Sequence, residues 1–334
     1  MLRVAVIGVG MMGQNHARVY AEMPEVELVG VADVDEEAAR RVAERYGTTP
    51  YQDYLRMLEE TKPVAVSVVV PTVEHHQVAL EVIQRGINLL IEKPLSFTIE
   101  EGKEIIEAAN AAGVQLMVGH IERFNPAVIA LKDYLAQGML GRVFQIDARR
   151  QGPFPARVKD VGVIIDLAVH DLDIMRYVTG SEVVRVYAET QRRIHSRHED
   201  LLSGMVRLAD GTVGTLTTNW LTPTKIRELN VIGERGMFRV DYLTQDLYFF
   251  ENASAAEGGW EAIQMLRGVK EGRMIRYAIA KREPLRNELE QFIAAVQGQA
   301  PVPVNGQDGL CALELAQALV RSGLEHRVVE LARR

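Results

Sequence analysis

The chain has 334 residues, which is long enough to bury a sizeable core and usually divides into two domains. Its 38 basic and 45 acidic residues give a net charge of −7, which provides no global attraction to nucleic acid or to an anionic membrane. Cys311 is the only cysteine, which excludes an internal disulfide and the two-cysteine redox and metal motifs.

The first apolar run follows Arg3 and breaks at Gly8. It is too short for the apolar part of an export signal or for a membrane span. We therefore expect a cytoplasmic protein with a small-molecule partner, and we expect neither nucleic acid nor membrane as a partner.

Residues 4–13, VAVIGVGMMG, predict a buried strand that runs into a glycine turn. In a dinucleotide-binding G-x-G-x-x-G, here Gly8, Gly10 and Gly13, the first glycine allows the tight turn and the second lets the backbone approach a pyrophosphate. The third lets the next helix pack closely on its strand. A helix over 11–23 supplies that context, whereas a glycine turn that binds nothing is the alternative. The residues expected at the cofactor are Gly8, Gly10, Met11, Met12 and Gly13.

The second strand, expected over 26–32, ends at Asp33. This carboxylate follows Gly13 by about 20 residues, the spacing at which it reaches the ribose hydroxyls of a dinucleotide. It accepts hydrogen bonds from a free diol but repels a 2′-phosphate, and Val34 and Asp35 offer no cation to bind one. The sequence therefore predicts NAD rather than NADP.

As far as residue 118, short β-branched runs alternate with amphipathic helices. That alternation is typical of a parallel sheet covered on both faces, in an α/β fold of the doubly wound kind. We expect further strands at 65–70, 88–91 and 114–118, and helices at 74–85 and 99–112.

Polar residues follow two of these strands. Ligands of open α/β sheets bind outside the carboxyl ends of the strands, and the fourth strand ends in Glu92-Lys93-Pro94. The proline biases Lys93 away from the helical region, so the lysine is held on an extended backbone. A surface lysine before a turn proline is the alternative. We expect the cofactor site to be lined by Pro71, His75, Glu92 and Lys93.

From about residue 119 the pattern changes to a helix at 126–137 followed by strands. Short turns join these strands, which predicts a mostly antiparallel sheet in a C-terminal α+β domain. The strands are expected at 143–150, 183–191, 202–208, 213–220, 226–232 and 237–242. Helices at 286–297 and 310–322 end the chain, and the segment at about 308–323 is a candidate to pack back onto the first domain.

The segment 160–177, DVGVIIDLAVHDLDIMRY, is predicted to be a helix that is apolar around most of its circumference. Asp166, His170, Asp173 and Tyr177 form one polar stripe on it. A carboxylate four residues before a histidine can orient the imidazole and raise its basicity. A stripe that merely faces solvent is one alternative. Zinc is another, but no cysteine or second histidine lies nearby to complete a site, and we expect no metal.

The glycine motif, Glu92-Lys93-Pro94 and the Asp166-x-x-x-His170 helix resemble the Gfo/Idh/MocA oxidoreductases, the glucose-fructose oxidoreductase and inositol dehydrogenase family. The resemblance covers essentially the whole chain. It implies an NAD-binding Rossmann domain, here 1–121, and an open-faced sheet domain for substrate binding and oligomerisation, here 122–334. It also implies that Lys93 and His170 meet at the nicotinamide. We expect a homo-oligomer, either a dimer or a tetramer.

Two longer stretches, IERFNPA from Ile121 and PFPARVKDVGVIIDLAVHD from Pro153, are similar to the UDP-N-acetylglucosamine 3-dehydrogenase branch of that family. Five cations between residues 142 and 159 stand against one acid, Asp147, and arginine matches phosphate oxygens in a fork. These cations are Arg142, Arg149, Arg150, Arg157 and Lys159. Ordinary solvated charges are the alternative for about half of them. The substrate-binding candidates are Arg123, Asn125, Arg149, Arg157, Asp166, His170 and Lys225.

Oxidation of a secondary alcohol requires a proton acceptor at the hydroxyl, while the cofactor accepts the hydride. His170, oriented by Asp166, can take the proton while Lys93 donates to the substrate oxygen. Lys93 can instead take the proton itself, because a buried lysine beside another cation loses its proton more readily. Both assignments stay open.

Three functions are compatible with these residues. The first is NAD-dependent oxidation of the 3-hydroxyl of a UDP-N-acetylhexosamine, either UDP-N-acetylglucosamine or its uronate. The second is an NAD-dependent dehydrogenase of a free sugar or inositol. The third is a non-catalytic dinucleotide sensor, which would be expected to have lost Lys93 or His170, and both are present.

Overall fold

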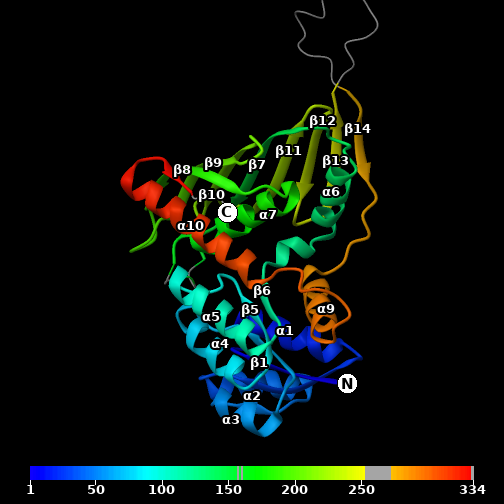
Figure 1. Cartoon of the computed structure of the whole chain (residues 1–334), viewed down its shortest axis with the longest axis vertical. Helices are drawn as coiled ribbons and strands as arrows, with labels where there is room; N and C mark the ends of the chain where they lie inside the picture. The colour runs from blue at the N-terminus through cyan, green and yellow to red at the C-terminus, as the bar shows by residue number, and fades with distance from the viewer. Residues whose placement is uncertain (156–157, 159–160, 253–271, 332–334) are drawn as a thin grey trace, which may run out of the picture. The chain divides into compact units, whose positions relative to one another are not determined.

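The structure, a computed structural model, describes residues 1–155, 158, 161–252 and 272–331. The chain folds into two compact units, and Figure 1 labels most of their helices and strands. The first comprises residues 1–124 and 282–314, and the second comprises residues 125–281 and 315–334. The chain therefore passes from the first unit to the second, returns to the first, and ends in the second.

The first unit is built on a six-stranded parallel sheet with the order β3-β2-β1-β4-β5-β6. This order reverses direction between β1 and β4, as in a doubly wound sheet, and it confirms the predicted fold class. The strands are β1 Leu2–Ile7, β2 Val26–Ala32, β3 Pro50–Tyr51, β4 Ala65–Val68, β5 Asn88–Glu92 and β6 Leu116–Gly119. Every residue of β4 is buried, as expected for a central strand covered on both faces.

Helices follow the strands of this sheet and begin at residues suited to capping. Asp35 caps the second helix, and Thr98 forms a capping box with Glu101 on the fifth. Gly47 and Gly113 end helices in the left-handed conformation. The helices are α1 Met11–Glu22, α2 Glu36–Tyr46, α3 Tyr54–Thr61, α4 His75–Gln84, α5 Ile99–Ala112 and α9 Pro284–Val296, with short 3-10 turns η1 Thr72–Glu74 and η2 Ile121–Phe124.

The second unit is built on a nine-stranded sheet with the order β14-β13-β12-β11-β7-β10-β9-β8-β15. Among the described strands only β7 and β10 pair in parallel, so the sheet is mostly antiparallel, as predicted. The strands are β7 Val143–Gln151, β8 Val183–Gln191, β9 Leu201–Leu208, β10 Val213–Asn219, β11 Ile226–Gly233, β12 Gly236–Asp241, β13 Asp246–Glu251, β14 Met274–Tyr277 and β15 Val329–Glu330.

Two helices, α6 Pro126–Ala136 and α7 Val169–Thr179, pack against one another and against strands of this sheet (Figure 1). Burial alternates along the strands: in β9, Leu202, Val206 and Leu208 are buried, whereas Met205 and Arg207 are exposed. One face of the sheet is therefore packed and the other is open. The last helix, α10 Gly306–Glu325, contributes to both units. Over the described part of the chain, no helix combines the length and the apolar character needed to cross a membrane.

An acidic side chain, Glu288 of α9, lies in the interior of the first unit. It is 0% exposed, and neither carboxylate oxygen has a hydrogen-bond partner among the described residues. Burial raises the pKa of Glu288 well above its usual value, and repulsion from Glu92 and Glu122 adds to the increase. The folded protein therefore favours the neutral form of Glu288.

Replacement of Glu288 by Gln is expected to stabilise the protein increasingly as the pH rises. The group is protonated when folded and ionises once unfolded, so unfolding releases a proton and a higher pH favours unfolding until the folded-state pKa is passed. Glutamine has a similar shape and does not titrate. The midpoint of urea unfolding, measured between about pH 5 and pH 8, tests this. Glu290→Gln on the same helix is the control and should show no such gain. A Glu288→Gln variant that is less stable at every pH would contradict the prediction.

Candidate functional site

Two glycines of the first turn are required by the packing of the chain itself. Gly8 has φ +87°, and a Cβ placed there would lie 2.4 Å from the Val69 carbonyl oxygen. A Cβ on Gly13 would lie 1.9 Å from the carbonyl oxygen of Gly8. Helix α1 therefore lies directly against the turn that follows β1, a position that only glycine permits.

Gly10 is different, because a Cβ there would meet nothing within 4 Å among the described residues. It is the residue before α1, and its neighbour Met11 is 66% exposed. The first N–H groups of a helix have no partner within the helix and favour an anion. The packing of the chain does not require glycine at this position, whereas a pyrophosphate approaching the backbone would. The loop therefore fits the dinucleotide that the sequence predicts.

Asp33 lies beside this loop, at the end of β2. Its Oδ2 accepts a hydrogen bond of 2.7 Å from the Val9 N–H, and its Oδ1 accepts one of 3.0 Å from the Asp35 N–H. The carboxylate is thus attached to the glycine turn and is partly exposed. An ionised carboxylate has about four acceptor positions, so it can accept further hydrogen bonds from a ligand. Its contact with a ribose stays a prediction.

The segment that carries Lys93 is anchored on both sides. The Lys93 N–H donates to Glu92 Oε2 at 3.2 Å, and the Lys93–Pro94 peptide is cis. On the other side, the His75 ring lies between two carbonyl oxygens, with Nδ1 2.8 Å from that of Pro94 and Nε2 3.0 Å from that of Val70. His75 is 1% exposed, and burial lowers its pKa. It connects the segment after β4 to the segment after β5.

The predicted contacts of His75, Pro71 and Met12 with the cofactor remain predictions. Pro71 is exposed directly before η1, and Met12 is partly buried in the first turn of α1.

In the second unit, the segment predicted as one regular helix begins as a π-helix, Ile164–Ala168, and continues as α7. The Val169 N–H donates to the Ile164 carbonyl, five residues earlier. This wider turn holds Asp166, and His170 follows in the first turn of α7. The 3.6-residue periodicity of the sequence does not reveal such a local change of winding, which is frequent at functional sites. Asp160, the first residue of the predicted helix, lies outside the described residues.

A residue from the segment before β9 accepts hydrogen bonds from the N–H groups at the start of the π-helix. Glu199 accepts the Ile164 N–H through Oε1 at 3.2 Å, and its carbonyl accepts the Val163 N–H at 2.9 Å. Burial raises the pKa of Glu199. A Cβ on Gly162 would lie 2.0 Å from Oε1 of Glu199, which explains the single glycine before the acid–histidine pair.

The polar stripe of this segment does not simply face solvent. His170 is 9% exposed and Asp173 1%, while Asp166 and Tyr177 are partly buried. Burial is costly for a polar group unless it has partners or a ligand. The stripe is therefore suited to chemistry in a place from which water is largely excluded.

A buried ion pair holds α7 on the sheet. The Arg150 guanidinium of β7 donates to both oxygens of Asp171, at 2.9 to 3.1 Å, and the two side chains are 4% and 1% exposed. The sequence grouped Arg150 with the basic strip and did not single out Asp171. Through this pair with Asp171, Arg150 anchors the helix that carries His170. The sequence alone does not reveal this role, because it depends on a long-range contact.

The other described cations of the strip also lie beside acids of this chain. Arg149 Nη1 is 3.5 Å from Glu228 Oε2, and Arg142 Nε is 3.6 Å from Glu234 Oε1. Arg157 and Lys159 lie outside the described residues. Lys225, directly before β11, is exposed.

Two further substrate candidates have structural partners within their own units. Arg123 is 7% exposed and forms an ion pair with Asp308 at 3.3 Å. Asn125 caps α6 by accepting the Ala127 N–H at 3.1 Å, and its amide donates to the Tyr242 carbonyl at 3.1 Å. Their contact with a substrate stays a prediction. In the described residues, no group of three or more histidine, cysteine or acidic side chains could hold a metal ion.

Sequence reasoning missed His16, whose Nε2 lies 3.1 Å from Glu92 Oε1. The available signal was a histidine on the apolar side of α1, three residues after Gly13.

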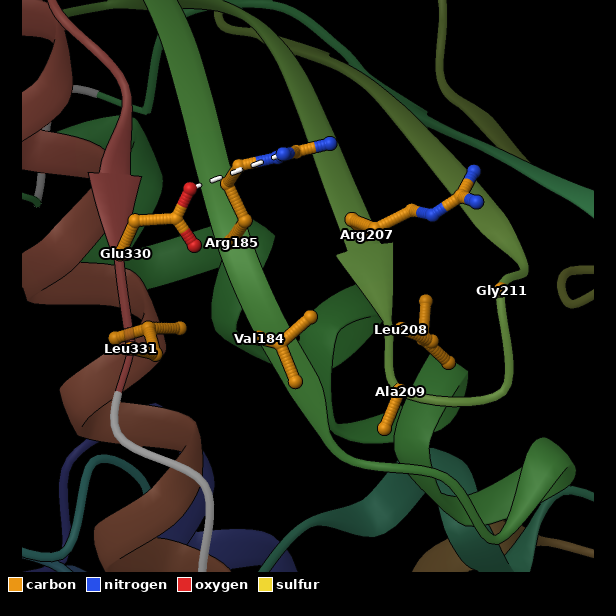
Figure 2. Close-up of a pocket in the computed structure, with 8 residues that line it drawn as sticks. All are labelled: Val184, Arg185, Arg207, Leu208, Ala209, Gly211, Glu330 and Leu331. Atoms are coloured by element: carbon orange, nitrogen blue, oxygen red, sulfur yellow. Dashed lines mark ion pairs between the residues drawn. The ribbon is translucent and has the colours of Figure 1, made fainter.

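A surface pocket of about 430 Å³ at the edge of the second sheet is drawn in Figure 2. Glu330 of β15 reaches Arg185 of β8 there, at 3.7 Å, and Arg207 of β9 lies alongside. None of the predicted site residues lines this pocket, so it is not the site that the motifs predict.

Two sequence models of known families match the chain. Residues 2–120 match the GFO/IDH/MocA oxidoreductase family with an NAD-binding Rossmann fold, and residues 128–239 match the GFO/IDH/MocA C-terminal domain. These matches fall on the two sheets described above.

Several known relatives match over almost their whole length. UDP-N-acetylglucosamine 3-dehydrogenase of Acidithiobacillus ferrooxidans is 32% identical over 94% of this chain and 95% of its own. A solved structure of that enzyme has a TM-score of 0.84 at 31% identity, covering 96% of this chain and 97% of that one. Inositol 2-dehydrogenase of Rubrobacter xylanophilus is 27% identical over 99% of this chain and 94% of its own. The chain therefore belongs to the Gfo/Idh/MocA family of oxidoreductases and carries the NAD-binding Rossmann domain of that family.

Proposed function

We propose that this protein uses NAD to oxidise the 3-hydroxyl of a UDP-N-acetylhexosamine, UDP-N-acetylglucosamine or its uronate, to the 3-keto sugar. The observation that carries this proposal is the similarity to UDP-N-acetylglucosamine 3-dehydrogenase over nearly the full length of both chains, at 32% identity. Inositol 2-dehydrogenases that match over 99% of the chain are 26–27% identical.

The roles proposed for the side chains follow from the chemistry of alcohol oxidation. When bound, NAD supplies the hydride acceptor. His170 accepts the hydroxyl proton, and Asp166 orients its ring. Lys93 donates to the substrate oxygen and stabilises its developing negative charge. The exchange of roles, with Lys93 taking the proton, is the alternative.

A dehydrogenase of a free sugar or inositol is the second candidate. Several relatives of comparable coverage are named inositol dehydrogenases. The basic strip is weaker support for a nucleotide-sugar substrate than its composition suggests. Arg142, Arg149 and Arg150 each lie beside a carboxylate of this chain. A diphosphate would have to compete with those acids.

The choice of NAD over NADP should depend on Asp33. The double substitution Asp33→Ser with Val34→Arg is expected to shift the ratio of kcat/KM values toward NADP, because it removes the charge that repels a 2′-phosphate and adds a cation. Val34 is 86% exposed, so the arginine can be accommodated there without a packing cost. Val34→Arg alone is the control and should still prefer NAD. Equal efficiency with the two cofactors in the unaltered protein would contradict the assignment.

Removal of the proposed proton acceptor should separate chemistry from binding. His170→Asn is expected to lower kcat by about 10² to 10⁴, the usual contribution of a positioned general base. Lys93→Met should abolish turnover. NADH formation from UDP-N-acetylglucosamine measures both effects, and calorimetry should show NAD binding retained in both variants. Turnover that survives in Lys93→Met would reduce the lysine to a structural residue of the turn.

Arg157→Ala tests whether the substrate carries a diphosphate. Loss of a hydrogen bond to a charged group should weaken UDP-sugar binding by roughly 1.5 to 3 kcal/mol. That corresponds to about ten- to a hundredfold in Kd. Arg142→Ala, from the same strip, is the matched control and should bind as the unaltered protein does. Calorimetry with NAD present measures both. A protein that ignores UDP-sugars but oxidises inositol would favour the second candidate.

A further inference from the structure

A continuous network of hydrogen-bonded polar side chains runs through the core of the first unit and ends at the N–H of Lys93. Tyr20 Oη lies 2.8 Å from Ser67 Oγ, which lies 3.1 Å from His16 Nδ1. His16 Nε2 lies 3.1 Å from Glu92 Oε1, and Glu92 Oε2 accepts the Lys93 N–H at 3.2 Å. The network thus links α1, β4 and the end of β5.

The direction of the hydrogen bond between His16 and Glu92 follows from the groups that form it. Burial raises the pKa of the Glu92 carboxyl, but the hydrogen bond and charge of His16, together with the charge of Lys93, lower it by more, so that Glu92 is ionised. An ionised carboxylate only accepts, so His16 donates through Nε2. On the other side of the ring, Nδ1 faces the Ser67 hydroxyl, which in turn faces the Tyr20 hydroxyl. Burial raises the pKa of Tyr20, which keeps its phenol a donor.

Stability alone does not account for these residues. Tyr20, His16 and Ser67 are 0% exposed and Glu92 is 8% exposed. Burying such groups is costly, and apolar residues of similar size often stabilise a core as well or better. A fully bonded buried network does, however, impose one geometry on its members. Gly119 of β6 leaves room for it, because a Cβ there would lie 3.1 Å from the Glu92 carboxyl carbon.

His16 connects two parts of the cofactor domain. It lies three residues after Gly13, on the helix that follows the glycine turn, and it contacts the acid that holds the peptide of Lys93. We propose that His16 is a positioning residue for Lys93, acting through the Glu92 carboxylate. This inference rests on the proposed role of Lys93 in turnover. A side chain of α1, the helix that follows the glycine turn, thereby fixes the backbone position of Lys93.

Other ionisable groups also act on Glu92. They are Lys93 itself, His75 of α4, and Glu288 of α9, whose neutral form is favoured by burial. With the neutral form of Glu288 favoured and His75 held between two carbonyls, the carboxylate of Glu92 depends mainly on His16.

Two substitutions at position 16 separate its two hydrogen bonds. A glutamine amide nitrogen reaches as far as Nε2 and can donate to Glu92, whereas an asparagine amide reaches only as far as Nδ1. His16→Asn is expected to lower kcat by roughly 10- to 100-fold, the cost of a misplaced catalytic group, with NAD affinity retained. His16→Gln should retain most of the kcat of the unaltered protein. Tyr20→Phe removes the far end of the network but leaves the bond to Glu92, and it should keep its turnover. An equal loss of kcat in Tyr20→Phe and His16→Asn would overturn the proposal.

A second measurement needs neither sugar nor NAD. The rate at which acetic anhydride labels Lys93 is followed by mass spectrometry, with the exposed Lys103 of α5 as the reference in the same sample. His16→Asn removes the donor to Glu92 Oε1 and so releases the carboxylate that holds the Lys93 N–H, and the reactivity of Lys93 relative to Lys103 should change several-fold. His16→Gln should leave the ratio unchanged. An unchanged ratio in a folded His16→Asn variant would overturn the proposal. If the unaltered protein ignores every UDP-sugar, the proposed function fails, but this ratio still decides the role of His16.

Discussion

The close approach of α1 to the turn after β1 is the constraint on which the first unit depends. A Cβ on Gly13 would lie 1.9 Å from the Gly8 carbonyl oxygen, so the helix can occupy this position only with glycine there. This placement of α1 leaves the backbone at Gly10 accessible. It also fixes the position of His16, which lies one turn further along the helix. The histidine then lies 3.1 Å from Glu92, and Glu92 holds the peptide of Lys93. Close packing at the two glycines thus shapes the loop that fits the dinucleotide and also brings His16 to Glu92, whose carboxylate accepts the N–H of Lys93 directly after β5.

The second unit positions its functional helix by the same physical means with different residues. Gly162 admits the Glu199 carboxylate, which accepts the first N–H of the π-helix that carries Asp166. Behind the helix, the Arg150–Asp171 pair is fully enclosed, so removal of either partner would leave a buried charge and cost roughly 3 to 5 kcal/mol. In both units ionisable side chains in the interior hold the segment that carries the proposed reactive groups.

Periodicity and capping residues were sufficient to predict most of the fold. The sequence predicted helix 99–112 and the strands at 26–32 and 183–191 with the bounds that the structure shows, because glycines, prolines and capping residues mark their ends. It could not predict the π-helix, because one extra residue in a turn leaves the apolar pattern almost unchanged. Nor could it predict that Arg150 pairs with Asp171, or that Arg123 pairs with Asp308, since these partners are chosen by tertiary packing. The sequence therefore predicts which residues carry charge but not which charges are already neutralised.

The distribution of these residues between the two units bears on substrate choice. The glycine turn, Asp33 and Lys93 belong to residues 1–124, whereas Asp166, His170 and the basic strip belong to the second unit. Structures named for different substrates, UDP-N-acetylglucosamine 3-dehydrogenase and a putative myo-inositol dehydrogenase of Sinorhizobium meliloti, superpose on this chain with TM-scores of 0.84 and 0.82. Because the backbone is nearly common to them, the substrate must be chosen by side chains on a shared frame. A change in the charges of those side chains can then change which substrate is bound, without any change in the residues proposed to hold NAD.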